Sequence, residues 1–244
     1  MQVIIPLAGL GTRLRPHTHT RPKPLISVAG KPILGYILDG LKGLAIDEVI
    51  FIVGYLGNQI EEYVKANYDF PARYVEQTER LGQAHAIYLA QDYISGPVLI
   101  IFVDTIFEAD LSRLSGCTAN GLIYVKEVKD PSRFGVVVEE RGFITRLVEK
   151  PSQPISNLAV IGVYYLTNSV ALLECIGELL QSGQTIQGEY FLADALQIMI
   201  DRGAKLLAKR VEVWEDCGNP ETLLATNRYL LEKSGGQMVP TQNT

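Results

Sequence analysis

A glycine-rich segment with an arginine lies near the start of the chain, at Gly9-Leu10-Gly11-Thr12-Arg13. It directly follows the apolar run at residues 3–7, which predicts a buried strand. Glycines at such a turn leave backbone N–H groups free to bind phosphate oxygens, and a guanidinium adds a planar, permanently charged donor. The same residues also fit a plain turn with a surface arginine, so the segment indicates a phosphate site only together with further groups.

A second cation lies in a stiff segment a few residues later. Lys23 stands between two prolines in Arg21-Pro22-Lys23-Pro24-Leu25. Proline fixes its own φ angle and restricts the residue before it, so the pattern predicts an extended backbone that limits where Lys23 can point. Two fixed cations, Arg13 and Lys23, beside one glycine-rich turn indicate a triphosphate site.

Two other phosphate-binding motifs do not fit the glycine-rich segment. A dinucleotide fingerprint requires a third glycine or alanine where this chain has Leu14, and an immediate helix that Pro16, Pro22 and Pro24 disfavour. A Walker loop requires Gly-Lys followed by serine or threonine, whereas the chain has Gly30-Lys31-Pro32. The segment is therefore neither a dehydrogenase-type nor a Walker-type loop.

Two aspartates far apart in the sequence occur where strands are predicted to end. Asp104 directly follows the apolar run at 98–103, and Asp216 follows a strand that ends at Val213-Trp214. Together they could hold Mg²⁺, with triphosphate oxygens and water completing the coordination. Each could instead cap the turn that follows it. His17-x-His19 also has a metal-like spacing, but it lacks the further ligands that zinc sites require.

The elements that must position these residues alternate in type along the first half of the chain. Apolar strands are expected at 3–7, 48–53, 73–76 and 98–103, and amphipathic helices at 31–44, 58–67 and 83–91. This alternation predicts a Rossmann-like α/β fold, with a mostly parallel sheet and helices on both faces. Such sheets bind ligands beyond the carboxyl ends of their strands. The loops after residues 7, 76 and 103 should therefore face a shared cleft.

The pattern changes after residue 120. Strand-like runs at 122–128, 134–139, 143–148 and 158–166 predict a small antiparallel insertion, followed by helices at 169–180 and 190–201, a strand at 205–213 and a helix at 220–232. We expect one domain over 1–233, made of a nucleotide-binding part at 1–119, the insertion at 120–166, and closing helices with a metal-site strand at 167–233. Residues 234–244 should form a flexible tail.

Composition excludes several classes of protein. The chain has 22 Lys and Arg against 27 Asp and Glu, a net charge of −5, which disfavours a nucleic-acid-binding protein. The longest apolar run, 97–103, is too short to cross a bilayer, so no membrane association is expected. The three cysteines form no Cys-x-x-Cys pair, and the first residues read as a strand rather than a signal peptide. We expect a cytoplasmic protein.

Several segments, taken in order, resemble one family of enzymes. They are residues 7–34 (LAGLGTRLRPHTHTRPKPLISVAGKPIL), 147–151 (LVEKP), 156–162 (SNLAVIG) and 216–218 (DCG). The chain resembles the sugar-1-phosphate nucleotidylyltransferases, which join a nucleoside triphosphate to a sugar-1-phosphate and release pyrophosphate. It is most similar to the UTP–glucose-1-phosphate uridylyltransferases, with the glucose-1-phosphate thymidylyltransferases second. The matching segments run from the first strand to the last helix.

The resemblance implies roles for particular residues. Arg13 and Lys23 would be catalytic, and Asp104 and Asp216 would bind Mg²⁺. The nucleotide would contact Leu7, Ala8, Gly9, Gly11, Thr12, Gln77 and Gly82, with Gln77 and Gly82 reading the base. The sugar phosphate would contact Gly135, Glu149, Lys150 and Val160, so the resemblance implies that the insertion at 120–166 is a sugar-binding insertion.

The neighbourhood of these residues departs from the family at two positions. Thr105 stands where many relatives have asparagine, and Gln187 stands where the thymidylyltransferases often have arginine. His85 could be a ligand, but we expect it to face the packed start of its helix.

We expect Mg²⁺-dependent transfer of a uridylyl group from UTP to glucose-1-phosphate, giving UDP-glucose and pyrophosphate. The attacking phosphate monoester is largely dianionic at neutral pH, since its second pKa is about 6, so the reaction requires no general base. The same chemistry with dTTP or another hexose-1-phosphate is the first alternative, and a regulatory protein that binds sugar nucleotides is the second. The family resemblance also implies that the protein could form a homo-oligomer.

Overall fold

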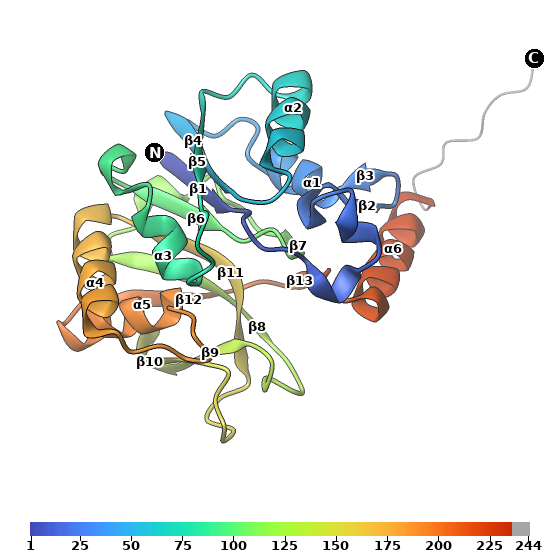
Figure 1. Ribbon diagram of the computed structural model, residues 1–244. Helices are drawn as coiled ribbons and strands as arrows, with labels where there is room; N and C mark the ends of the chain where they lie inside the picture. The colour runs from blue at the N-terminus through green and yellow to red at the C-terminus, as the bar shows by residue number, and fades with distance from the viewer. Residues whose placement is uncertain (236–244) are drawn as a thin grey trace, which may run out of the picture.

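The computed structural model describes residues 1–235 and is built on one mixed sheet of nine strands (Figure 1). The strand order across the sheet is β5-β4-β1-β6-β11-β8-β12-β10-β9. Helices pack on both faces of this sheet, as the sequence predicts. No helix of residues 1–235 is long and apolar enough to cross a membrane.

The first half of the sheet is parallel, as expected. Its strands are β1 (Gln2–Pro6), β4 (Glu48–Val53), β5 (Ala72–Glu76) and β6 (Val98–Ile101). Neighbouring residues of β1 point to opposite faces, so Ile4 joins one apolar core and Val3 and Ile5 join the other. Both faces of the inner strands β1, β4 and β6 are covered, which explains why residues 3–5, 49–53 and 98–101 are apolar without interruption.

The helices divide between the two cores. Helices α3 (Gln83–Tyr88), α4 (Ser169–Ser182) and α5 (Leu192–Asp201) pack on one face, and α1 (Ile33–Gly40) and α2 (Gly57–Asn67) on the other. Helix α3 is shorter than predicted because the chain turns into a 3₁₀ turn at Gln91–Tyr93. Helix α1 is also shorter than predicted, because Lys31–Pro32 forms strand β3 and pairs with β2 (Ser27–Val28).

The second half of the sheet contains the predicted antiparallel strands. They are β8 (Gly121–Glu127), β9 (Gly135–Glu140), β10 (Phe143–Glu149) and β11 (Leu158–Leu166). Rather than standing apart, they extend the central sheet, because β11 pairs antiparallel with β6. The register of β11 against β8 breaks between Val160 and Tyr164, around Gly162 at φ +81°. This break lets one end of β11 pair with β6 and the other end with β9.

The end of the chain differs from the expectation in two ways. The single strand predicted at 205–213 is two strands, β12 (Leu206–Arg210) and β13 (Val213–Asp216). Strand β12 lies between β8 and β10, whereas β13 leaves the main sheet and pairs with β7 (Thr105–Glu108), which the sequence analysis missed. Helix α6 (Pro220–Gly235) includes the first two residues of the expected tail. The rest of that tail, 236–244, lies outside the described residues.

Candidate functional site

A cavity of about 650 Å³ opens at the carboxyl ends of the parallel strands. Its walls come from the segments after β1 and β6, from β9 to β11, and from the end of β13. The predicted site residues that line it are Leu7, Gly9, Gly11, Thr12, Arg13, Lys23, Asp104, Gly135, Glu149, Lys150, Val160 and Asp216. The fold thus gathers side chains from almost the whole length of the chain at one edge of the sheet.

Asp104 and Asp216 are brought together by the short β7–β13 ladder. Thr105 pairs with Asp216 in this ladder, and the Cys217 amide donates to the Asp104 carbonyl at 2.7 Å. The Asp216 carboxylate also accepts from the Gly218 amide at 2.7 Å, so the capping role considered for this residue is present as well. One Asp216 oxygen is used by the backbone, and the other, Oδ2, is directed toward the cavity residues.

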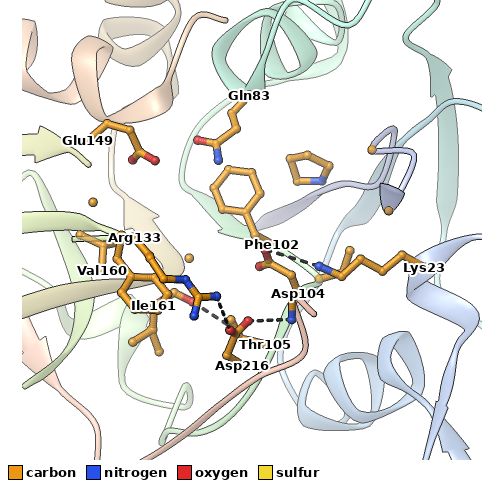
Figure 2. Close-up of a pocket in the computed structure, with 18 of the residues that line it drawn as sticks. Lys23, Gln83, Phe102, Asp104, Thr105, Arg133, Glu149, Val160, Ile161 and Asp216 are labelled. Carbon is orange, nitrogen blue, oxygen red and sulfur yellow. Dashed lines mark hydrogen bonds and ion pairs between the residues drawn. The ribbon is translucent and has the colours of Figure 1, made fainter. Parts of the chain in front are cut away.

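Each aspartate is paired with a cation. Lys23 Nζ lies 3.7 Å from Asp104 Oδ2, and Arg133 Nη2 lies 3.3 Å from Asp216 Oδ2. Figure 2 shows the two cations on opposite sides of the two carboxylates. Arg133 is not among the predicted site residues, although it lies two residues before Gly135, and a basic residue this close to a predicted sugar-phosphate contact is a usable signal.

The glycine-rich segment packs tightly against the lysine. Gly11 has left-handed backbone angles, and a Cβ on it would lie 2.9 Å from Lys23 Cβ. Arg13 stands on a 3₁₀ turn at Thr12–Leu14, with an exposed side chain at the cavity. The two predicted cations are therefore carried by neighbouring segments, as expected from their spacing.

The backbone around Lys23 corrects one expectation. Of the segment predicted to be extended, Pro22 is extended, but Lys23–Leu25 forms a 3₁₀ turn closed by a 3.0 Å hydrogen bond from the Ile26 amide to the Lys23 carbonyl. The turn is compatible with its proline, because a residue in the first turn of a helix has no hydrogen-bond partner for its N–H group, and proline lacks only that group.

The other end of the cavity carries Glu149 and Lys150. The Glu149 side chain is mostly buried, and Lys150 Nζ lies 3.6 Å from its Oε1. Burial raises the pKa of the Glu149 carboxyl, and the Lys150 ammonium partly opposes the rise. Gly135 pairs with Glu149 in the β9–β10 ladder, and a Cβ on Gly135 would lie 2.9 Å from Glu149 Oε2. Only glycine, which has no Cβ, leaves space for the Glu149 carboxylate at position 135.

Backbone strain accompanies this end of the site. Lys150 is a non-glycine residue at φ +41°, and its ammonium lies 4.7 Å from the centre of the Phe191 ring. Such left-handed conformations in large residues persist where the surrounding structure holds them, and they occur often at functional sites. Lys150, with this strained backbone, lines the cavity.

Four aromatic rings form part of the wall of the large cavity, and none of them was predicted to bind a ligand. Phe102 and Tyr164 meet edge to face with ring centres 5.8 Å apart, and Phe134 and Trp214 do so at 4.9 Å. All four line the cavity. Trp214 also packs against one of the two cores, so it belongs both to the core and to the cavity wall. Burial raises the pKa of the Tyr164 hydroxyl far above its ordinary value.

A second, smaller cavity of about 260 Å³ holds two further predicted residues, Ala8 and Gln77. The Gln77 side chain is buried, with Nε2 3.2 Å from the Gly82 carbonyl oxygen and 3.1 Å from His85 Nδ1. Gly82 lines neither cavity; its carbonyl instead accepts from Gln77. A Cβ on Gly82 would lie 2.6 Å from the Tyr190 carbonyl oxygen, so this position requires glycine.

The donor set suits a hard divalent cation shared with substrate. Among residues 1–235 there is no group of three or more His, Cys, Asp or Glu side chains that could hold a metal alone. Two carboxylates leave most of an octahedral shell to phosphate oxygens and water, which is the usual way in which Mg²⁺ is bound at phosphate-transfer sites.

Comparison with known proteins identifies the family. The model of the family described as "Nucleotidyl transferase" matches residues 2–233. The chain belongs to this nucleotidyl transferase family. The resemblance stated from the sequence motifs is thereby confirmed, and members of the family generally use a divalent metal ion.

Curated relatives of this nucleotidyl transferase carry several names. The UTP–glucose-1-phosphate uridylyltransferase AglF of Haloferax volcanii is 35% identical over 243 residues, covering 96% of this chain and 98% of the relative. A glucose-1-phosphate thymidylyltransferase of Streptomyces antibioticus is 35% identical, covering 95% of this chain and 67% of the relative. The bifunctional protein GlmU of Methanocaldococcus jannaschii is 37% identical, but this chain spans only 55% of its length.

Solved structures share the fold over nearly the whole chain. A UDP-glucose pyrophosphorylase complexed with UDP-glucose has a TM-score of 0.83 at 25% identity, with coverage of 95% of this chain and 98% of that one. A glucose-1-phosphate thymidylyltransferase from Bacillus anthracis has a TM-score of 0.81 at 25% identity. The α/β fold with its antiparallel strands is therefore that of sugar-1-phosphate nucleotidyltransferases.

Proposed function

We propose that this nucleotidyl transferase makes UDP-glucose and pyrophosphate from UTP and glucose-1-phosphate, with Mg²⁺. The observation that carries the proposal is the charge arrangement of the large cavity. The pairs Lys23–Asp104 and Arg133–Asp216 lie at one end, and Glu149–Lys150 lies at the other. The similarity to AglF, which extends over nearly the full length of both chains, supports the choice of UTP and glucose-1-phosphate.

The proposed reaction forms one P–O bond and breaks another. A phosphate oxygen of glucose-1-phosphate attacks the α-phosphorus of UTP, and the bond from that phosphorus to the bridging oxygen breaks, releasing pyrophosphate. The nucleophile is already anionic, so the site has to position two anions and neutralise them rather than remove a proton. The cavity is lined by Arg13, Lys23, Arg133 and Lys150, which suits this task.

Each charged residue takes a role that follows from its place. Asp104 and Asp216 would hold Mg²⁺, which supplies positive charge to the reacting phosphates when bound. Lys23, next to Asp104, would stabilise the charge that grows on the α-phosphate. Arg13, on the glycine-rich segment, would hold the departing pyrophosphate. Lys150 would hold the phosphate of the sugar in line for attack.

The ends of the two substrates would lie in different places. Glu149, buried beside Gly135, would accept hydrogen bonds from sugar hydroxyl groups. The base would enter the smaller cavity, where Gln77 can bond to the edge of a pyrimidine. Leu7 and Gly9 line the large cavity and Ala8 lines the small one, so the segment after β1 would lie between the phosphates and the base.

The first experiment measures pyrophosphate release with Mg²⁺ and glucose-1-phosphate, testing UTP, dTTP, GTP, ATP and CTP in parallel. Release with UTP above all other donors is the expected result. Release with dTTP alone would change the donor, an alternative that the similarity to thymidylyltransferases supports. Release with another hexose-1-phosphate in place of glucose-1-phosphate would change the acceptor. An absence of release with every pair would overturn the proposal.

A further inference from the structure

The side-chain amide of Gln77 lies within hydrogen-bond distance of two polar groups. Its Nε2 lies 3.2 Å from the Gly82 carbonyl oxygen and 3.1 Å from Nδ1 of His85, on the first turn of α3. The sequence analysis expected His85 to face the packed start of its helix. The structure places the ring, which is half-buried, against the residue proposed to read the base.

The position of the amide is fixed from the backbone outward. The Gln77 amide N–H donates to the Val53 carbonyl at 2.8 Å, which continues the β4–β5 pairing by one residue. Gly82 is fixed as well, because the Tyr190 backbone donates to the Leu81 carbonyl at 2.8 Å and accepts from the Ala84 amide at 3.0 Å. The Gln77 side chain therefore reaches between two rigid segments.

The chemistry of the two partners decides which way the amide faces. A carbonyl oxygen can only accept, and Nδ1 of a neutral histidine accepts when the proton is on Nε2. A glutamine amide has two N–H groups; the Gly82 carbonyl accepts one, and His85 Nδ1 in this tautomer accepts the other. The oxygen Oε1 is the part of the amide left to the small cavity that Gln77 lines. The opposite orientation would set Oε1 against the Gly82 carbonyl oxygen, with which it cannot form a hydrogen bond.

We propose that His85 is a positioning residue that holds Gln77 with its acceptor oxygen toward the base, so that the site selects pyrimidines with a ring N–H. Uracil and thymine present N3–H to such an acceptor, whereas N3 of cytosine is itself an acceptor. This inference rests on the proposed function, in which the base occupies the small cavity. It deepens that function by assigning the discrimination of UTP and dTTP from CTP to a pair of residues rather than to Gln77 alone.

The test compares His85→Leu with the matched control His85→Asn. Leucine keeps the bulk of the side chain but has no acceptor, whereas asparagine can offer its oxygen near the place of Nδ1. Binding of UTP and CTP with Mg²⁺, without sugar phosphate, is measured by calorimetry. We expect the wild-type protein and His85→Asn to prefer UTP. His85→Leu should lose about fivefold of that preference, the scale of one neutral hydrogen bond.

Kinetics separate positioning from a general structural defect. In His85→Leu the KM for UTP should rise, while kcat and the KM for glucose-1-phosphate stay near their wild-type values. A wild-type ratio of CTP to UTP affinity in folded His85→Leu would overturn the inference, and so would equal binding of UTP and CTP by the wild-type protein.

Binding of N3-methyl-UTP to the wild-type protein gives a second test that needs no variant. This nucleotide keeps the uracil ring but lacks the N3–H, so it should bind at least tenfold more weakly than UTP; equal binding would overturn the inference even if His85→Leu fails to fold. Because all of these binding measurements need no turnover, a UTP preference without pyrophosphate release would count against the proposed function and not against the role of His85.

Discussion

The two ends of the large cavity form their charge pairs in different ways. At the phosphate end, each pair joins segments far apart in the chain, Lys23 with Asp104 and Arg133 with Asp216. At the sugar end, Glu149 and Lys150 are consecutive, and the carboxylate is set by its neighbour across the β9–β10 hairpin, Gly135. The phosphate end therefore depends on long-range topology, whereas the sugar end depends on one hairpin. Changes at the two ends should affect different kinetic constants.

The largest effect is expected from Asp216→Asn at the phosphate end. Loss of one carboxylate from the pair would weaken Mg²⁺ binding and lower turnover by roughly 10²-fold or more. Pyrophosphate release measured against Mg²⁺ concentration checks this result. Glu215→Gln, one residue earlier on the same strand, is the matched control and should stay near wild-type. Wild-type turnover in folded Asp216→Asn would remove the metal assignment.

The second largest effect is expected from a change to the charged partner of Asp216 at the phosphate end. Arg133→Gln removes the cation 3.3 Å from Asp216 Oδ2, so the carboxylate should bind a divalent ion more tightly while turnover falls about tenfold. Mn²⁺ binding followed by electron paramagnetic resonance measures the first change, and pyrophosphate release measures the second. Arg113→Gln, which removes an exposed arginine paired with Asp110, serves as the control. Unchanged Mn²⁺ affinity would show that Arg133 does not compete for Asp216.

The sugar end is tested by Gly135→Ala. The added methyl group would lie 2.9 Å from Glu149 Oε2 and displace the carboxylate. We expect the KM for glucose-1-phosphate to rise about tenfold with little change in the KM for UTP, a shift that a displaced hydrogen-bond acceptor explains. Gly116→Ala, where an added Cβ would meet nothing within 4 Å, is the control. A rise in both KM values would contradict the separation of the two ends.

The smallest effect concerns pH and the buried carboxyl of Glu149. Burial raises its pKa in the folded state, so the unfolded chain releases this proton at lower pH, and the stability contributed by the protonated form is lost as pH rises through the folded pKa. Glu149→Gln should therefore melt about 1 to 2 °C above the wild-type protein at neutral pH and match it at pH 4. Melting curves of both proteins across this range check the sign.

The sequence predicted the fold better than it predicted the contacts within the site. Strands such as Glu48–Val53 and Leu158–Leu166 have the predicted bounds, because continuous apolar runs between turns leave few other interpretations. Strand β7 was missed because its four residues gain their structure only by pairing with β13, more than a hundred residues later. The local sequence of residues 105–108 contains no information about a pairing partner so far away in the chain.

The same limit applies to two contacts within the site. Arg133 was not predicted as a site residue, and His85 was expected to face the packed start of its helix; both contacts depend on distant groups, Asp216 and Gln77. Lys23 was assigned to the right neighbourhood from its prolines, but the turn around it was not, because a hydrogen bond to Ile26 outweighs the extended preference. Sequence motifs identify residues that belong to one site, whereas the packing of the fold decides which groups each side chain contacts.

The pairing of β7 with β13 has a consequence for synthesis of the protein. A chain that leaves the ribosome from its N-terminus can complete the parallel strands β1, β4, β5 and β6 once residue 101 has emerged. Asp104 emerges three residues later, but the second carboxylate, Asp216, arrives only with residues 213–216, more than a hundred residues farther along the chain. A nascent chain therefore carries only half of the phosphate end while more than a hundred further residues are synthesised.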